Sequence, residues 1–429
     1  MIMKGCERML LQFSVENFKS FKEKAVLSME ASSDKDLKGN FTMVGKDRIL
    51  HSVVIFGANA AGKSNLFLAL TAAILTVRES NSRQINNQLT RIVPFAFDDD
   101  FVTKPTSFEF VFITEGKKYV YGFSATKKTV VNEYLYVYNS SKAATIFERN
   151  EDNYKFTSPT IRKELLPIVE RNTGNKLFLA TATAWNCDST RIPYLWIAEL
   201  INTCSTDKKV LTPLVSNMFD DDDDRLRIFT NKMLQEADIN ISDYVYESTE
   251  VSREEMKRTM PAEIQSFVTL PPTAKNIHIE TIHTIENRGG SKKYSLSMSD
   301  ESSGTQNLFM FSPVLKQALD RGETICIDEF DMSLHPLLVI YLIKLFNNPD
   351  MNRFHAQLIV SSHSMELLSL NHLRRDQIYF VEKKRKTGES ELYSLDEFSP
   401  RNNEDVRRNY LNGRYGALPY IQGETDLWQ

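Results

Sequence analysis

The sequence is poor in cysteine and has no long, uninterrupted apolar run. Its four cysteines form no CxxC pair and no metal-ligand spacing, and so few in a chain of 429 residues exclude a disulfide-stapled scaffold. We therefore expect a reducing, cytoplasmic setting. No window reaches the ~18 consecutive apolar residues of a membrane-spanning helix, and no targeting segment stands out, so no membrane association is expected.

Neither sign of charge is in excess. Lys and Arg number 52 against 56 Asp and Glu, for a formal net charge of −4. This balance excludes a chain-wide basic field for nucleic acid or anionic membranes, although a local patch such as the basic run at 383–386 is compatible with it. With 41% hydrophobic residues the chain has enough apolar mass for a core, which excludes global disorder.

The length predicts two structural units, or one fold with a large insertion. Alternating apolar residues predict strands in the N-terminal part and an antiparallel sheet between about 95 and 138, whereas residues 161 to about 265 have helical spacing. Strands and helices then alternate, which is typical of a mixed or parallel sheet wrapped by helices. We expect an α/β fold of four parts: 1–158, with an antiparallel β lobe; 159–272, a helical insertion; 273–400, the second half of the sheet; and 401–429, a tail.

One segment matches the phosphate-loop pattern GxxxxGK[ST] without deviation. It runs from Gly57 to Ser64 as GANAAGKS, after an apolar strand-like run and before a helical one. In this context the backbone N–H groups wrap a phosphate and the helix N-terminus favours the anion. The pattern predicts an ATP site whose Lys reaches the phosphates and whose Ser ligates Mg²⁺. The predicted binding residues are Gly57, Asn59, Ala60, Gly62, Lys63, Ser64 and Asn65.

A second segment supplies paired carboxylates. The apolar run at 324–327 ends in Asp328 and Glu329. At the carboxyl end of a strand these side chains would lie beside the phosphate loop. Asp328 is then predicted to hold Mg²⁺, and Glu329 to orient or deprotonate the attacking water.

Two further segments connect the sequence to a known class. SSGTQ at 302–306 precedes the carboxylates, and LIVSSH at 358–363 follows them. With the phosphate loop and the opening QFSVENFKSF, this order resembles the ATP-binding-cassette (ABC) class of ATPase heads found in SMC, RecF and OLD-family proteins. The usual LSGGQ signature of that class reads SSGTQ here.

The resemblance implies that two heads sandwich two ATP molecules. Ser303, Gly304 and Gln306 would then contact the nucleotide of the opposite head, and His363 would contact the terminal phosphate or the attacking water. It implies a functional homodimer, or a higher oligomer built from it. It also implies a glutamine that senses the metal, for which Gln84 and Gln88 are the candidates.

Two features resemble the abortive-infection branch of that class. A Leu-His-Pro at 334–336 follows the carboxylates, which would place His335 at the interface between heads, and NYLNGRYGALP at 409–419 is similar to the tail of AbiLi-like and RloA-like ATPases, the branch that includes the ATPase of the PARIS anti-phage system. The tail segment is also consistent with a Gly-Tyr loop that packs an aromatic residue on the core.

The resemblance implies an ATPase of bacterial anti-phage defence. OLD relatives carry a TOPRIM nuclease, but the residues after His363 contain no spaced carboxylate motif for one. We therefore expect a separately encoded toxic effector, with a TOPRIM-like nuclease as the leading candidate. Two alternatives remain: a RecF-like or SMC-like ATPase that binds DNA in repair or recombination, and the motor subunit of a transporter, which the Leu-His-Pro segment fits less well.

Overall fold

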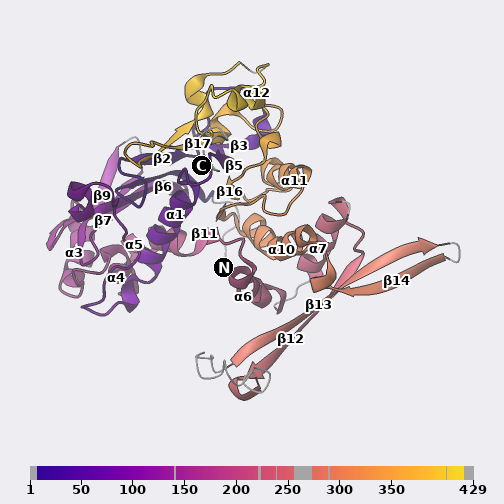
Figure 1. Cartoon of the computed structure of the whole chain (residues 1–429). Helices are drawn as coiled ribbons and strands as arrows, with labels where there is room; N and C mark the ends of the chain where they lie inside the picture. Colours follow the sequence, from indigo (N-terminus) through magenta and orange to yellow (C-terminus); the bar gives the residue numbers. More distant parts are fainter. Residues whose placement is uncertain are drawn as a thin grey trace, which may run out of the picture. The chain divides into compact units, whose positions relative to one another are not determined.

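The computed structural model describes residues 7–139, 142–220, 224–237, 239–255, 273–287, 290–401 and 403–419. The chain divides into two compact units, each described here by itself. The first unit comprises Met1–Cys204, Ala318–Asp331 and Pro336–Gln429, and the second comprises Ser205–Gln317 and Met332–His335. Figure 1 shows the path of the chain.

A seven-stranded antiparallel sheet forms one layer of the first unit, in the order β10-β9-β8-β7-β6-β1-β2. Its strands are β1 (Met9–Glu16), β2 (Ala25–Ser28), β6 (Thr106–Thr114), β7 (Lys117–Ala125), β8 (Val130–Tyr138), β9 (Ala143–Asn150) and β10 (Asn153–Lys155). Alternate residues of β1 and β6 face the core, where Phe13 and Phe110 lie 5.0 Å apart.

A short helical stretch covers the inner face of this sheet. Its elements are α3 (Pro159–Val169), α4 (Phe178–Ala184), α5 (Asp188–Leu195) and the π-helical turn η3 (Trp196–Leu200). Trp196 is buried and stacks on Phe112 of β6 with 4.1 Å between ring centroids. Burial of such large aromatic surfaces fixes this stretch to the first unit.

The second sheet of this unit has six strands in the order β11-β15-β16-β5-β17-β18, and only β18 runs antiparallel to its neighbour. The strands are β5 (Ser52–Phe56), β11 (Ile201–Cys204), β15 (Thr324–Ile327), β16 (Gln357–Ser361), β17 (Ile378–Lys383) and β18 (Ser390–Ser394). The continuous apolar runs of β5, β15 and β16 are fully buried, as expected for parallel strands covered on both faces.

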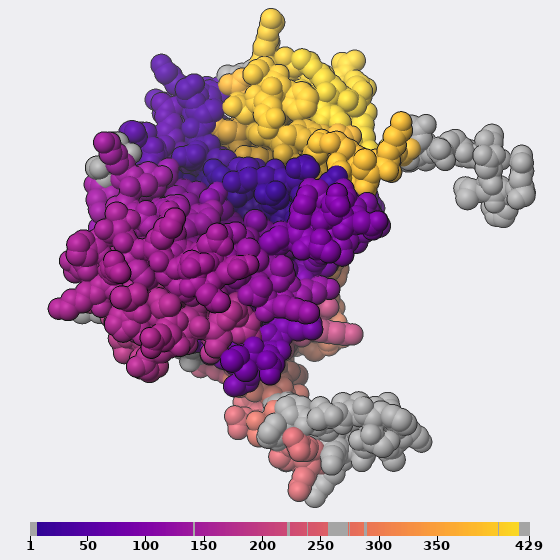
Figure 2. Space-filling view, turned by 90° about the vertical axis from the view of Figure 1, so that its left-hand side faces the viewer, coloured from indigo at the N-terminus to yellow at the C-terminus, as the bar shows by residue number. Residues whose placement is uncertain are grey.

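Helices flank the six-stranded sheet. Helix α1 (Lys63–Arg78) shares a core cluster with Val53 and Ile55 of β5, and α11 (Pro336–Asn347) contacts β5 and β16. The unit also contains the hairpin of β3 (Phe41–Val44) and β4 (Asp47–Leu50), the helices α2 (Asp99–Thr103) and α12 (Val406–Leu411), and several short 3-10 turns. Figure 2 shows the N-terminal residues, in indigo, lying at the surface between magenta and yellow segments of this unit.

The second unit combines helices with a three-stranded antiparallel sheet. Its elements are α6 (Lys208–Asp220), α7 (Asp224–Glu236), β12 (Asp243–Ser252), β13 (Thr273–Asn287), β14 (Gly290–Ser297) and most of α10 (Ser303–Arg321). The long strand β13 pairs with β12 along its first part and with β14 along its last (Figure 1). Phe219, Tyr244 and Phe309 form its aromatic core, with ring centroids 4.9 to 5.9 Å apart.

The architecture confirms the expected α/β fold with a mixed sheet and an N-terminal antiparallel lobe. Two details differ from the expectation. Residues 159–204 belong to the first unit because their aromatic residues pack on its sheet, and residues 243–252 are a strand rather than a helix. In DYVYESTEVS the Val, Tyr and Thr residues have strand propensity, which outweighs the helical spacing upstream. The expected end of the insertion at 272 lies outside the described residues, as do residues 420–429 of the tail.

Within the described ranges, no helix is both long and apolar enough to cross a membrane.

Candidate functional site

The phosphate loop connects β5 to α1, as the pattern predicts. Gly57 and Gly62 have φ of 156° and 118°, and Ala60 has φ of 62°. A Cβ atom at Gly57 would lie 2.4 Å from the carbonyl oxygen of Val381, and one at Gly62 would lie 2.4 Å from Ser390 Oγ. Both positions therefore require glycine, for backbone conformation and for close approach to the β17–β18 hairpin.

Lys63 is the first residue of α1, and its side chain is folded back over the loop. Its Nζ donates hydrogen bonds to the carbonyl oxygens of Gly57 at 2.8 Å and Ala58 at 3.3 Å. Burial lowers the pKa of this amine, and the nearby carboxylates, led by Asp328, act in the opposite direction. The lysine is thus held where the loop and the paired carboxylates meet.

The carboxylates follow β15, beside the end of the parallel strand β16. Ser361 connects them, because its hydroxyl donates to Asp328 Oδ1 at 2.5 Å and accepts from the backbone N–H of Glu329 at 2.8 Å. Glu329 has φ of 52°, in the left-handed region, and its side chain is exposed. A non-glycine residue in this region costs ~1 kcal/mol or more, a strain that persists where surrounding contacts enforce it.

These segments meet around a cavity of about 430 Å³ in the first unit, which we call the phosphate-loop cavity. Its lining residues are Asn59, Ala60, Gly62, Lys63, Ser64, Asn65, Glu329, His363 and Lys383. It lies at the carboxyl ends of parallel strands, where ligands of open α/β sheets bind. Its size suits a small-molecule ligand.

The structure thus brings together most of the predicted site residues. Asp328 does not line the cavity but directly precedes Glu329, which does. Gly57 does not line it either, and its carbonyl oxygen accepts a hydrogen bond from Lys63 Nζ. Gln84 and Gln88 are exposed, and neither lines the cavity.

His363 is the second residue after β16, and its position depends on a residue that sequence reasoning missed. Asp331 Oδ2 accepts hydrogen bonds from the backbone N–H of His363 at 2.7 Å and from the Ser362 hydroxyl at 2.9 Å. Asp331 stands two residues after Glu329, so its proximity to the paired carboxylates was the available signal. The contacts of Asp331 with Ser362 and His363 become visible only when β15 is paired with β16.

The donor set is compatible with Mg²⁺. Ser64 contributes a hydroxyl and Asp328 a carboxylate, and Mg²⁺ prefers such oxygen ligands, typically one or two from protein with the rest from phosphates and water. Within the described part of the chain, no group of three or more His, Cys, Asp or Glu side chains could hold a metal ion by itself.

Ser303, Gly304 and Gln306 lie in the second unit, at the start of α10. A Cβ atom at Gly304 would lie 2.7 Å from the carbonyl oxygen of Ser333, so this glycine allows close packing. The Gln306 side chain donates to the carbonyl of Glu301 at 2.8 Å and accepts from Lys208 Nζ at 2.6 Å. Ser303 is exposed.

The departure from the usual signature has a local explanation. The Ser302 hydroxyl accepts a hydrogen bond from the backbone N–H of Thr305 at 3.1 Å and lies 2.8 Å from the Thr305 hydroxyl. Ser302 therefore caps the first turn of α10, and Thr305 is buried beside it.

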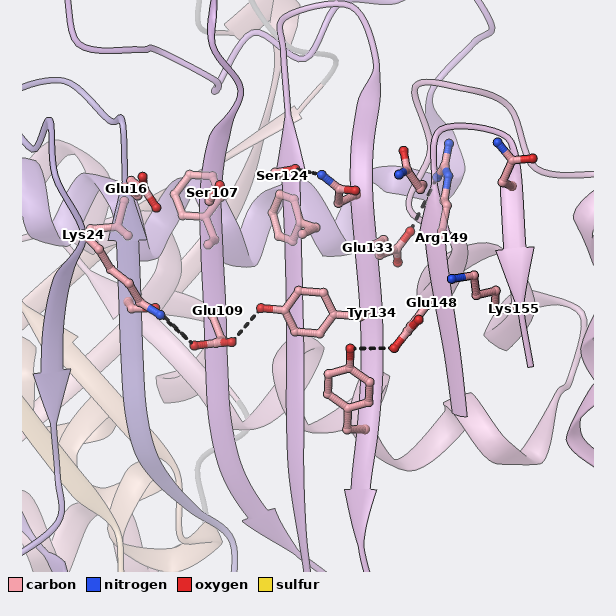
Figure 3. A pocket seen from close by; sticks show the side chains of 18 residues that line it. Glu16, Lys24, Ser107, Glu109, Ser124, Glu133, Tyr134, Glu148, Arg149 and Lys155 are labelled. Carbon is pink, nitrogen blue, oxygen red and sulfur yellow. Dashed lines mark hydrogen bonds and ion pairs between the residues drawn. The ribbon is translucent and has the colours of Figure 1, made fainter. Parts of the chain in front are cut away.

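A second cavity, of about 650 Å³, lies on the seven-stranded sheet (Figure 3). Several of its polar groups pair with one another: Glu109 accepts from Lys24 at 3.2 Å and from the Tyr134 hydroxyl at 2.6 Å, and buried Glu133 pairs with Arg149 at 3.5 Å. None of the predicted site residues lies in it. The phosphate-loop cavity is therefore the stronger candidate for a catalytic site.

The phosphate loop, the paired carboxylates after β15 and the parallel strands that carry them are the features of a P-loop ATPase. The chain matches the model of the AAA_21 family, described as "AAA domain, putative AbiEii toxin, Type IV TA system", over residues 52–181 and 216–369. Since these segments make up more than half of the chain, it belongs to this family.

Three solved structures are similar to the chain at low sequence identity. The SMC head domain from Thermotoga maritima is 13% identical, with a TM-score of 0.41 over 90% of this chain and 98% of that one. An Smc head bound to the C-winged helix domain of ScpA is 14% identical, with a TM-score of 0.43 over 90% and 97%. An Smc head domain with an extended coiled coil, bound to the C-terminal domain of ScpA derived from Pyrococcus furiosus, is 13% identical, with a TM-score of 0.40 over 91% and 98%. No curated protein matches the chain.

Proposed function

We propose that the chain binds ATP with Mg²⁺ in the phosphate-loop cavity and hydrolyses it to ADP and phosphate. The observation that carries this proposal is that Lys63, Glu329 and His363 line one cavity although they come from distant parts of the chain. Membership of an AAA domain family supports it.

Each residue then has a defined task. The loop N–H groups and Lys63 bind the phosphate chain, while Ser64 and Asp328 hold Mg²⁺, which when bound neutralises phosphate charge. Glu329 orients and deprotonates the water that attacks the terminal phosphate. His363, held through its backbone by Asp331, contacts that phosphate.

We further propose that the active form is a homodimer of heads, or a higher oligomer built from it. Ser303 and Gly304 would complete the nucleotide site of the opposite head. In support, Ser303 is exposed as the first residue of a 19-residue helix, and the N-terminal end of a helix favours an anion.

In the cell, we propose that this ATPase acts in the cytoplasm in anti-phage defence by abortive infection. It would hold or release a separately encoded toxic effector, with a TOPRIM-like nuclease as the candidate. The family description, which names a putative AbiEii toxin and a Type IV TA system, supports this biological setting.

The biochemical part is tested by measuring ATP binding and phosphate release with Lys63→Ala and Glu329→Gln. We expect Lys63→Ala to abolish tight ATP binding, and Glu329→Gln to bind ATP but to hydrolyse it about 100-fold or more slowly, since general-base catalysis contributes 10²–10⁴-fold. Hydrolysis at the wild-type rate in both variants would refute the assignment of the site.

The biological part is tested by the survival of phage-infected cells that express the chain with its neighbouring genes. Both substitutions should remove protection. Unchanged protection in both would rule out an ATP-dependent mechanism. ATP-dependent, salt-sensitive DNA binding without any effect on survival would instead favour the repair or recombination alternative.

A further inference from the structure

A second lysine lines the phosphate-loop cavity, from the side opposite the catalytic groups. Lys383 is the last residue of β17, and β17 pairs with β5 on the side away from β16 and β15. The cavity therefore has Glu329 and His363 on one side of the loop and Lys383 on the other.

The backbone that carries Lys383 is fixed to the loop. The carbonyl of Val381 lies against Gly57, so closely that no Cβ fits between them. Lys383 is paired across the β17–β18 hairpin with Ser390, whose hydroxyl donates to the carbonyl of Ala61 at 2.6 Å. The backbone of Lys383 is thus anchored to the phosphate loop, whereas its side chain is exposed.

The charge of Lys383 is not neutralised by any described side chain. Its neighbour Lys384 forms ion pairs with Glu389 and Glu391, whereas no carboxylate among the described residues pairs with Lys383. Lys384 lies after the end of β17, where its backbone bonds to Glu389 and Gly388 close the hairpin turn. The four basic residues at 383–386 therefore do not share one environment, because the first of them, Lys383, lines the cavity.

We infer that Lys383 binds the phosphate chain of the nucleotide from the β17 side. This inference rests on the proposed function. Glu329 and His363, on the β16 side, act at the terminal phosphate. Lys383, on the opposite side, therefore binds the phosphates that ATP and ADP share. It contributes affinity for both nucleotides rather than to the hydrolysis step, which defines it as a binding residue.

The test is equilibrium binding of ATP and ADP, with steady-state hydrolysis, for Lys383→Ala. We expect the affinity for both nucleotides to fall about tenfold, the loss typical of one charge-assisted hydrogen bond. The KM for ATP should rise by a similar factor, with kcat within about twofold of wild type, because uniform binding is lost. Lys383→Arg should restore most of the affinity.

Lys386→Ala is the matched control, since Lys386 is an exposed lysine of the same hairpin that does not line the cavity. It should bind both nucleotides like wild type. Thermal unfolding midpoints of all variants exclude loss of folding as the cause, and Lys383→Met, which retains the aliphatic stem, provides a second measurement of the charge alone.

The outcomes separate the two proposals. If the wild type binds ATP and Lys383→Ala binds it equally well, the role of Lys383 is overturned and the proposed function stands. A large fall in kcat with unchanged affinity would also overturn it, since Lys383 would then act on the reaction. If neither the wild type nor Lys63→Ala binds ATP, the proposed function itself fails.

Discussion

The carboxylate of Asp331 accepts a hydrogen bond from the backbone N–H of His363 at 2.7 Å. The same Oδ2 atom accepts from the Ser362 hydroxyl, so one acceptor atom holds two consecutive residues at the end of β16. The side chain of His363 therefore reaches the cavity from a backbone that Asp331 positions.

Removing this acceptor should impair hydrolysis more than binding. For Asp331→Ala we expect kcat to fall about tenfold, equivalent to ~1.4 kcal/mol of barrier, with ATP affinity changed by less than about threefold. Asp331→Asn retains an acceptor oxygen and should recover a large part of the rate. Equal losses of kcat in both variants would show that the charge of Asp331, rather than its hydrogen bonds, is what matters.

Ser361 should control the response to Mg²⁺. Its hydroxyl orients Asp328 and also accepts from the Glu329 N–H, and it is fully buried. Ser361→Ala should raise the Mg²⁺ concentration for half-maximal hydrolysis and cost ~1–2 kcal/mol of unfolding free energy, because two part-buried polar groups lose their partner. A Mg²⁺ titration of the hydrolysis rate, with urea unfolding of the same variant, checks both. An unchanged titration curve would contradict the assignment of Asp328 to the metal.

Gly62 should tolerate no side chain. A Cβ atom there would lie 2.4 Å from Ser390 Oγ and 2.8 Å from Ser20 Oγ, on a backbone with φ of 118°. We expect Gly62→Ala to lose ATP binding and to unfold at least ~2 kcal/mol more easily, from steric overlap added to backbone strain. Gly45→Ala is the matched control, because Gly45 also has positive φ but has nothing within 4 Å of the added atom. It should cost about 1 kcal/mol and leave ATP binding intact.

His51 should make the stability of the protein depend on pH between about 4 and 6.5. Burial lowers its pKa to about 4, and its ring stacks on that of His355 with 5.8 Å between centroids. The unfolded chain therefore binds a proton that the folded chain does not, so this contribution is present above pH 6.5 and is lost as the pH falls towards 4. We expect the unfolding free energy to drop by ~1–2 kcal/mol between pH 7 and pH 5. Urea unfolding at both pH values should show a smaller drop in His51→Gln; an equal drop would exclude His51 as the cause.

The sequence predicted those site residues that lie next to one another along the chain. The phosphate loop and the Asp328-Glu329 pair are each a short, contiguous pattern, and the strand on which each lies could be predicted from an apolar run. Asp331 and Lys383 were not predicted as site residues because their roles depend on contacts between distant segments. Residues 159–204 were placed in the wrong part for the same reason, since the stacking of Trp196 on Phe112 has no local signal.

The tail segment shows how packing resolves an ambiguous pattern. Tyr415 is buried and stacks on Phe380 of β17 with 6.0 Å between ring centroids, and Gly416 has φ of 66° where a Cβ would overlap Glu382 and Tyr393. The segment is therefore a glycine-dependent loop that packs an aromatic residue on the core. This packing is compatible with membership of the family, and it explains why Gly and Tyr are adjacent there.

Phe380 of β17 also contacts aromatic residues of two other segments. It pairs in register with Phe56, the residue that directly precedes the phosphate loop, and their rings lie 6.3 Å apart. Tyr415 stacks on the same ring, so three aromatic side chains, Phe56, Phe380 and Tyr415, pack in sequence beside the start of the phosphate loop. The ring contacts of Phe380 therefore connect the folding of the segment around Tyr415 to the strand from which the phosphate loop begins.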